Sequence, residues 1–344
     1  MKNIHLSTAT GKEKLLYPAA EYNYLYTFKG RERNMIKDFV LNDTITAFLS
    51  VRKRDVREYG GKSFLSFEFG DASGKIAGVW WEPDHFGLEE LTEGMVVKVK
   101  GAIGDYKGNL QVKVVKMRPA KDEEYSLNDI LPHSKYSEEE LRARILGLTE
   151  KIENGNVRKL ADAFWKDEAF LAAYLKAAAG KLWHHACVGG LAEHSANVAE
   201  ICLEMGRRYL FLDRDLLIFG GLFHDMGKIS QYEITSLIDY SSEGRLIGHI
   251  CWADHVITSR AEKIDFFPPN LLMKIRHLII SHQGQLDYAS PIVPQIPEAF
   301  ILFYADEIDS KMGAIERIRD KTGAGWSEYV KLLDRFLYFG EPEK

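Results

Sequence analysis

The spacing of hydrophobic residues changes once along this chain of 344 residues, and that change limits the folds open to it. From Phe39 to about Arg118, apolar and charged residues alternate with a period of two, as in Met95–Gly101 (MVVKVKG). This alternation is typical of strands with one buried face. Beyond Ser137 the apolar residues recur with a helical period. The sequence therefore predicts a small β-barrel followed by an all-helical domain.

The boundaries follow from the same pattern. We expect a barrel of about five strands over residues 36–119, a polar linker over 120–136, and a helical domain over 137–340 that starts with a capping box at Ser137–Glu140. Residues 1–35 show no clear period, so they form an N-terminal extension of uncertain structure. A short hairpin with its turn at Ser241-Ser-Glu-Gly244 is expected over 232–246. Helices are expected near residues 138–152, 156–178, 188–209, 214–226, 247–264, 269–282, 297–319 and 326–338.

Composition excludes several classes of protein. Apolar residues make up 46% of the chain and charged residues 28%, which excludes a disordered or fibrous protein. The apolar runs are far shorter than the roughly 20 residues of a membrane span, so we expect no membrane partner. The three cysteines are scattered and form no CxxC pair, which argues against a disulfide framework and favours the reducing cytoplasm.

Basic and aromatic residues gather in the first third of the chain, although the net charge is −5. Basic clusters bind phosphates, and exposed aromatic rings stack on bases of single strands. A solvated sheet face and a buried core are the alternatives for these residues. The candidates for substrate binding are Arg52, Lys53, Arg54, Phe64, Trp80, Trp81, Lys98, Lys100, Tyr106, Lys107 and Lys113.

Histidines gather in the helical region, where eight of the eleven lie between His184 and His282. Imidazole and carboxylate together suit divalent metals such as manganese, iron, cobalt or zinc. Such ions activate water and stabilise charge on a phosphoryl oxygen. Ligands on separate helices are what a bundle-core metal site requires. The candidates lie on different predicted helices: His194, the pair His224-Asp225, His249, His282 and Asp306.

These motifs are similar to a known family. The segment His224-Asp-Met-Gly-Lys228, with His194 before it and Asp306 after it, resembles the HD superfamily of metal-dependent phosphohydrolases. The resemblance extends to the YhaM-type 3′-5′ exoribonucleases, which carry an OB-fold before the HD domain, and covers roughly residues 39–320. The supporting motifs include His184–Ser195, Glu243–Ile250, Ser281–Gly284, Ser290–Pro294 and Asp306–Met312.

The resemblance implies particular roles. His194, His224, Asp225 and Asp306 would bind one ion, and Asp225 would bridge to a second ion held by His249 and His282. Lys228 would approach the scissile phosphate. Apart from the resemblance, Asp309 shares a helix face with Asp306 and is expected either to support a metal ligand or to be structural. Manganese is favoured, with iron, cobalt, nickel, zinc and magnesium as alternatives. The family usually has histidine at Gln283 and glycine at Ala289, so the number of ions, one or two, stays open.

Two further histidines, His184 and His185, are candidates for contact with the substrate or with the ligands. The expected reaction is attack of a metal-bound hydroxide on the 3′-terminal phosphodiester of single-stranded RNA, with release of nucleoside 5′-monophosphates. Single-stranded DNA is an alternative substrate. The rival hypotheses are a phosphohydrolase of nucleotides or cyclic dinucleotides and a nucleic-acid-binding protein with a decayed site. A homo-oligomer is also open.

Overall fold

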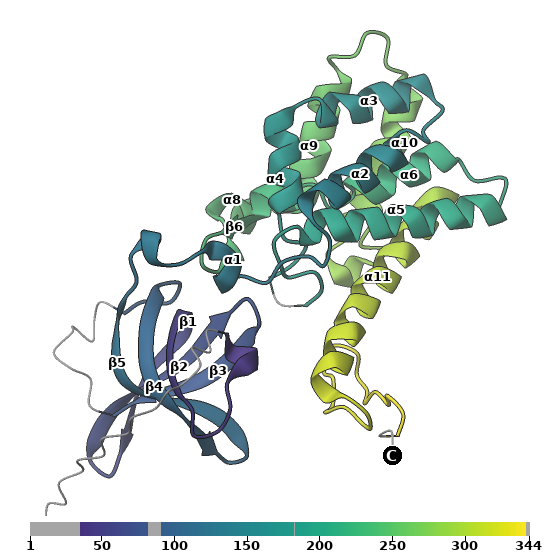
Figure 1. Ribbon diagram of the computed structural model, residues 1–344. Coiled ribbons are helices and arrows are strands. Elements are labelled where there is room, and N and C mark those ends of the chain that lie inside the picture. The colour runs from purple at the N-terminus through teal and green to yellow at the C-terminus, as the bar shows by residue number, and fades with distance from the viewer. Residues whose placement is uncertain (1–34, 82–90, 182, 342–344) are drawn as a thin grey trace, which may run out of the picture. The chain divides into compact units, whose positions relative to one another are not determined.

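The computed structural model describes residues 35–81, 91–181 and 183–341 (Figure 1). The expected N-terminal extension therefore lies outside the described residues, apart from Met35. The described chain forms a five-stranded barrel and a helical domain, which confirms the predicted fold class. No helix within these ranges has both the length and the hydropathy that a membrane span requires.

The barrel closes in the order β1-β2-β3-β5-β4, with β4 returning to pair with β1. Among the five strands described for the barrel, β3 and β5 are the pair that runs parallel, and the other pairs are antiparallel. The strands are β1 (Thr44–Tyr59), β2 (Lys62–Asp71), β3 (Gly74–Trp80), β4 (Val96–Tyr106) and β5 (Asn109–Pro119), and a short 3₁₀ helix, η1 (Ile36–Asp38), precedes them.

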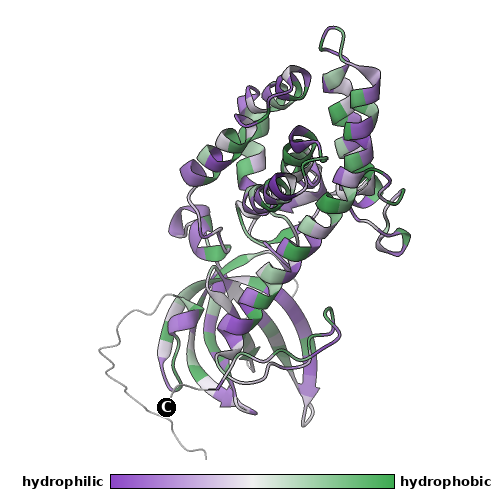
Figure 2. Cartoon of the chain, turned by 90° about the vertical axis from the view of Figure 1, so that its right-hand side faces the viewer, coloured by the Kyte–Doolittle hydropathy of each residue, from purple (hydrophilic) through white to green (hydrophobic). Residues whose placement is uncertain are grey.

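Alternation along the strands builds the core of the barrel. Hydrophobic and hydrophilic residues follow one another along each strand (Figure 2). In β2, for example, Leu65, Phe67 and Phe69 are buried while the residues between them face outward. Trp80 pairs with Leu65 and is only 2% exposed. Trp80 is therefore a core residue, and the expectation that it stacks on bases is wrong.

The helical domain follows a linker that carries η2 (Asp122–Glu124) and α1 (Leu127–Ile130). Ser137 accepts a hydrogen bond from the Glu140 amide, and Glu140 accepts one from the Ser137 amide, as the capping box predicts. The remaining elements are α2 (Glu138–Thr149), α3 (Gly155–Trp165), α4 (Glu168–Lys176), α5 (Gly190–Arg208), α6 (Arg214–Phe223), α7 (Lys228–Gln231), β6 (Tyr232–Ile234), β7 (Ile238–Tyr240), α8 (Ser242–Leu246), α9 (His249–Ala261), α10 (Pro269–Ser281), η3 (Leu286–Tyr288) and α11 (Pro297–Thr322).

Two of the expected helices are wrong. The segment 156–178 is divided into α3 and α4, because Asp167 accepts a hydrogen bond from the Phe170 amide and starts a new helix. Residues 326–338 are not helical but form isolated antiparallel bridges, Trp326 with Tyr338 and Val330 with Arg335. Residues 323 and 325, both glycines with positive φ, end the preceding helix, and aromatic side chains then pair across the loop.

The expected hairpin at 232–246 is shorter than predicted. Its strands β6 and β7 meet at a turn over residues 235–237. Ser241 does not belong to that turn, because its hydroxyl accepts a hydrogen bond from the Gly244 amide and caps α8.

Candidate metal centre

Close packing of α5 on α6 brings His194 and His224 together. A Cβ added at Gly221 would lie 2.4 Å from the Cα of Ala199, so only glycine allows this approach of the two helices. His224 follows the last residue of α6, and both histidines are fully buried. Their Nε2 atoms lie 3.2 Å apart. The two imidazoles therefore point their outer nitrogens at a common place.

Two carboxylates complete this first metal position. The Nε2 atom of His194 lies 3.2 Å from Oδ1 of Asp306 and 3.5 Å from Oδ2 of Asp225. The Nε2 atom of His224 lies 3.5 Å from the same Asp225 oxygen. His194, His224 and Asp306 form a group that can hold a metal ion. Asp225 adds a fourth ligand atom on the same side.

The other oxygen of Asp225 faces a second position. Its Oδ1 atom lies 3.4 Å from Nε2 of His249 and 3.5 Å from Nε2 of His282, and these three residues form a second such group. A Cβ at Gly227 would lie 2.0 Å from the backbone oxygen of His249. The glycine two residues after Asp225 therefore lets α9 approach closely enough to bring His249 to the carboxylate.

An oxygen near Nδ1 orients each of the four imidazoles. The Nδ1 atoms of His224 and His282 lie 3.0 and 2.7 Å from the backbone oxygens of Gly221 and Ile279. Nδ1 of His249 lies 2.7 Å from Oε1 of Gln231, and Nδ1 of His194 lies 2.6 Å from Oδ2 of Asp309. Because each acceptor is an oxygen, each Nδ1 donates its proton outward. The Nε2 atoms then face the two positions.

Burial and charge set the protonation of the centre. Burial lowers the pKa of His224 to about 4 and that of His249 to about 3, so both are neutral at neutral pH. Burial also opposes the charge on His194, but its contacts with Asp225, Asp306 and Asp309 raise its pKa well above 6.5. Burial likewise opposes ionisation of Asp225, yet Lys228 and the imidazoles hold its pKa well below the ordinary value.

These residues fit divalent metal ions. Oδ1 of Asp225 and Nε2 of His249 are buried and have no hydrogen-bond partner among the described residues. Buried polar atoms without a partner are costly, so their convergence here calls for a cation. The donor set of imidazole and carboxylate, without thiolate, suits manganese, iron, cobalt, nickel or zinc and does not choose among them.

Three further residues were expected at this site, and the structure places each next to a different ligand or support: Lys228, His184 and His185. Nζ of Lys228 lies 2.5 Å from Oδ2 of Asp225, and the side chain is buried. The imidazole of His184 lies 5.0 Å from that of His194, and both of its nitrogens are buried without a partner in the described structure. Burial lowers the pKa of His184 to about 2. His185 instead contacts Asp309, with its Nε2 atom 2.9 Å from Oδ2 of that carboxylate.

Gln283 and Ala289 are the two residues that differ from the family pattern. Nε2 of Gln283 lies 3.1 Å from Nε2 of His282, so this amide borders the second position. Ala289 has φ 64°, in the left-handed region that favours glycine. A glycine at residue 289 would adopt this conformation without strain.

Exposed aromatic residues meet at one end of the barrel. The rings of Phe64 and Trp81 stack at 4.4 Å, and Tyr59 meets Trp81 edge-on at 6.3 Å. Tyr59 is 73% exposed and Trp81 46% exposed. Arg57 pairs with Phe64 across β1 and β2 and is also exposed. We call Arg57, Tyr59, Phe64 and Trp81 the aromatic face.

The basic candidates do not form one group. Arg52 is half-buried and donates a hydrogen bond to the backbone oxygen of Ile130, so it has a structural role rather than the expected phosphate contact. Lys53 lies near Asp55, and Arg54 is also half-buried. Lys98, Lys100 and Lys113 lie on β4 and β5, and Lys107 lies in the turn between those strands beside exposed Tyr106.

Sequence reasoning missed several functional contacts. Tyr59 and Arg57 were not singled out, although their place at the end of a strand, just before Gly60-Gly61, is a signal of an exposed hairpin tip. Gln231 was missed because its contact with His249 depends on how α7 meets α9.

Comparison with known proteins agrees with this geometry. Residues 191–311 match the HD domain family, and residues 44–120 match a family of OB-fold nucleic acid binding domains. The 3′-5′ exoribonuclease YhaM of Bacillus velezensis is 30% identical over 81% of this chain and 88% of its own length. This chain belongs to the YhaM family.

The comparisons also found a second YhaM relative and a number of solved structures. YhaM of Bacillus subtilis is 29% identical over the same shares of both chains. Among solved structures, a domain of replication protein A from Methanococcus maripaludis matches 25% of this chain and 93% of its own length, with 20% identity and a TM-score of 0.23. The YhaM relatives thus match both the barrel and the helical domain.

Proposed function

We propose that this YhaM-family protein is a metal-dependent 3′-5′ exonuclease of single-stranded RNA. The observation that carries the proposal is that His194 and His224, which also face Asp306, lie near one oxygen of Asp225, while His249 and His282 lie near the other. Single-stranded DNA is a second substrate to test. Manganese is the metal that we favour.

The chain's own residues supply the framework for hydrolysis. A divalent ion at these positions would provide Lewis acidity and an activated water at neutral pH. Asp225 would fix the two metal positions relative to each other, because one of its carboxylate oxygens faces the first position and the other faces the second. The ammonium of Lys228, beside Asp225, would move to the scissile phosphate as its charge develops. His184 offers two unpaired nitrogens to the terminal nucleotide.

The barrel would hold the strand. Stacking on aromatic side chains contributes about 1–3 kcal/mol per base and tolerates any sequence. The aromatic face offers such rings beside an exposed arginine. Lys98, Lys100, Lys107 and Lys113 are proposed to bind phosphates on β4 and β5. We also propose a cytoplasmic location, since Cys187, Cys202 and Cys251 are all unpaired.

The test uses single-stranded RNA labelled at its 5′ end. With Mn²⁺ we expect a ladder of shortening labelled products and release of nucleoside 5′-monophosphates. EDTA or Asp225→Asn should abolish the ladder, while RNA binding in a gel-shift assay should persist. Asp320→Asn, which alters an exposed acid on α11, is the control and should retain activity.

Three results would contradict the proposal. Undiminished degradation by Asp225→Asn would reject the site. RNA that is bound but left intact by the wild-type protein would indicate a decayed site. Hydrolysis of nucleotides or cyclic dinucleotides with RNA left intact would indicate a different phosphohydrolase.

A further inference from the structure

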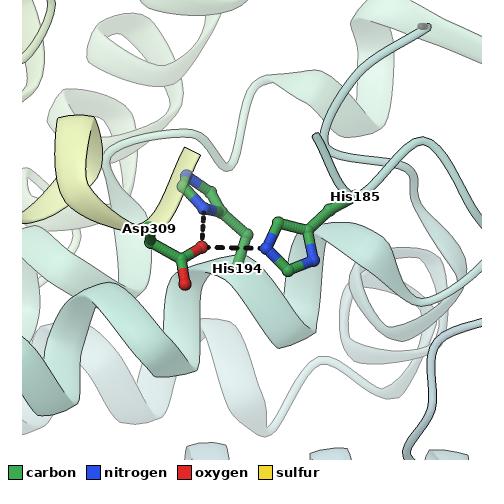
Figure 3. Close-up of side chains that lie close together, drawn as sticks. All are labelled: His185, His194 and Asp309. Atoms are coloured by element: carbon green, nitrogen blue, oxygen red, sulfur yellow. Dashed lines mark hydrogen bonds and ion pairs between the residues drawn. The ribbon is translucent and has the colours of Figure 1, made fainter. Parts of the chain in front are cut away.

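Asp309 lies behind the first metal position rather than in it. It follows Asp306 by three residues on α11, so both carboxylates lie on one side of that helix. Oδ2 of Asp309 lies 2.6 Å from Nδ1 of His194, on the side of the ring away from Nε2 (Figure 3). This carboxylate therefore contacts a ligand and not the metal position.

Three donors converge on this one carboxylate. Besides Nδ1 of His194, Nε2 of His185 lies 2.9 Å from Oδ2 (Figure 3). The side-chain amide of Asn197 donates to Oδ1 at 2.8 Å. Burial opposes ionisation of Asp309, but the contacts with His185 and His194 hold its pKa below the ordinary value. An ionised carboxylate that accepts three hydrogen bonds has little freedom to turn.

The backbone conformation of His185 and a contact with Glu193 fix the position of its imidazole. The φ of His185 is 43°, in the left-handed region that few residues other than glycine adopt, although histidine tolerates it better than most. Its Nδ1 lies 3.8 Å from Oε1 of buried Glu193, and Glu193 accepts a hydrogen bond from the hydroxyl of Ser134 at 2.6 Å. The strained backbone and the second carboxylate together aim Nε2 of His185 at Asp309.

The acceptor behind His194 differs from those behind the other three imidazoles. Two of those acceptors are backbone carbonyls and the third is the Gln231 amide, all neutral. A charged acceptor forms a stronger hydrogen bond and makes the ring more basic toward a metal. The structure therefore gives one ligand of the first position a stronger support than any ligand of the second.

The same three residues can also be considered as ligands of an ion of their own, since His185, His194 and Asp309 form a compact group. An ion on Nδ1 of His194 would put the ring proton on Nε2, which lies 3.2 Å from both His224 and Asp306. That proton would exclude a cation from the first position. A neutral imidazole can bind a metal ion at only one of these two sites. The three other ligand atoms near Nε2, from His224, Asp225 and Asp306, favour the first position.

We propose that Asp309, held by His185 and Asn197, is a positioning residue that accepts the Nδ1 proton of His194 and so directs Nε2 to the first metal position. The inference rests on the proposed function, because it deepens the account of that metal centre.

The test measures Mn²⁺ binding by titration with electron paramagnetic resonance of free Mn²⁺. Loss of such a supporting partner typically weakens metal affinity by about 10–100-fold. We therefore expect Asp309→Asn to bind Mn²⁺ more weakly by that factor at the first position and normally at the second. Activity at saturating Mn²⁺ should recover in part, so the effect falls on the metal requirement more than on kcat. Affinity of the metal-free protein for RNA should stay as in wild type, and so should all properties of the Asp320→Asn control.

A pair of variants at His185 tests the positioning of Asp309 by a second route, which does not depend on how well Asp309→Asn folds. His185→Ala removes the donor to Asp309 and should weaken Mn²⁺ binding. His185→Gln keeps an amide that can donate to the carboxylate, so it should bind Mn²⁺ more tightly than His185→Ala. The visible spectrum of the Co²⁺-substituted protein should change in Asp309→Asn and His185→Ala, because the orientation of a ligand changes.

The outcomes separate this inference from the proposed function. Wild-type Mn²⁺ affinity in both Asp309→Asn and His185→Ala would overturn the positioning role and leave the metal centre intact. Equal losses in His185→Ala and His185→Gln would also overturn it, because the donor would then be irrelevant. A wild-type protein that binds no Mn²⁺ would instead contradict the proposed function.

Discussion

At the scale of single residues, the ligands differ in the protons that a metal ion must displace. His224 and His249 are neutral at neutral pH, and Asp225 and Asp306 are ionised. His194 is the exception, because three carboxylates raise its pKa well above 6.5. Among these ligands, only His194 has to lose a proton when a cation binds at Nε2.

This difference predicts how metal affinity depends on pH. Because the proton on His194 competes with the metal, Mn²⁺ affinity should rise with pH, by about tenfold per unit below the pKa of His194. Calorimetric titrations in buffers of different ionisation enthalpy should show about one proton released per ion at the first position. An affinity that does not change between about pH 6 and pH 8 would contradict this protonation scheme.

The sequence predicted the ligand types, their helices and an indirect or structural role for Asp309, but not which side chain supports which ligand. His194, His224, Asp225, His249, His282 and Asp306 were expected because mixed imidazole and carboxylate at these spacings is unusual, and the structure brings them together. Asp309 and Gln231 act through hydrogen bonds whose partners depend on helix packing. Such contacts carry no periodic signal. Trp80 and Trp81 were both expected to bind the substrate, but only the fold shows that Trp80 is buried and Trp81 exposed.

At the scale of elements, the close approach of α7 and α9 determines whether the second position exists. Gly227→Ala would place a methyl group 2.0 Å from the backbone oxygen of His249, and that oxygen cannot rotate away. The start of α9 must then move, carrying His249 from Asp225. Overpacking of this kind costs about 1–3 kcal/mol of stability.

We therefore expect Gly227→Ala to lose activity by about 100-fold, as displacements near 1 Å commonly do, and to lose Mn²⁺ at the second position. Activity assays and Mn²⁺ titration measure both effects. Gly147→Ala is the matched control, because a Cβ on that helical glycine meets nothing within 4 Å. Gly147→Ala should keep full activity and gain up to about 1 kcal/mol of stability. Equal behaviour of the two variants would contradict the packing argument.

The aromatic face of the barrel gives a second prediction at this scale. Trp81→Ala should weaken binding of single-stranded RNA by about 1–3 kcal/mol, the usual contribution of one stacked base. Fluorescence anisotropy with labelled RNA measures the change. Trp326→Ala removes another exposed tryptophan, one that lies outside the barrel, and should bind RNA like wild type. Unaltered binding by Trp81→Ala would remove the aromatic face from the proposed strand-binding surface.

Element prediction failed where local spacing and tertiary packing disagreed. Apolar residues at 326, 329, 333 and 336 suit a helix, yet the glycines at 323 and 325 and the ring pairs Trp326–Tyr338 and Tyr329–Phe336 produce an irregular loop. The barrel was easier to predict, because a period of two over several strands leaves few alternatives.

At the scale of the whole molecule, the chain combines an OB-fold barrel and a helical HD domain, and the YhaM relative from Bacillus velezensis matches 81% of it. The helical domain also exposes a stripe of apolar residues spaced four apart on α11: Phe300, Tyr304, Ile308 and Met312. Self-association of the chain stays a prediction, and this stripe is where such a contact would be sought.

The most direct measurement is anomalous X-ray diffraction from crystals soaked in Mn²⁺. The account predicts a peak among His194, His224, Asp225 and Asp306 and a second one among Asp225, His249 and His282. It predicts none between His185 and Asp309. A map without a peak at the first position, or with its peak beside Nδ1 of His194, would contradict the metal centre on which the proposed exonuclease depends.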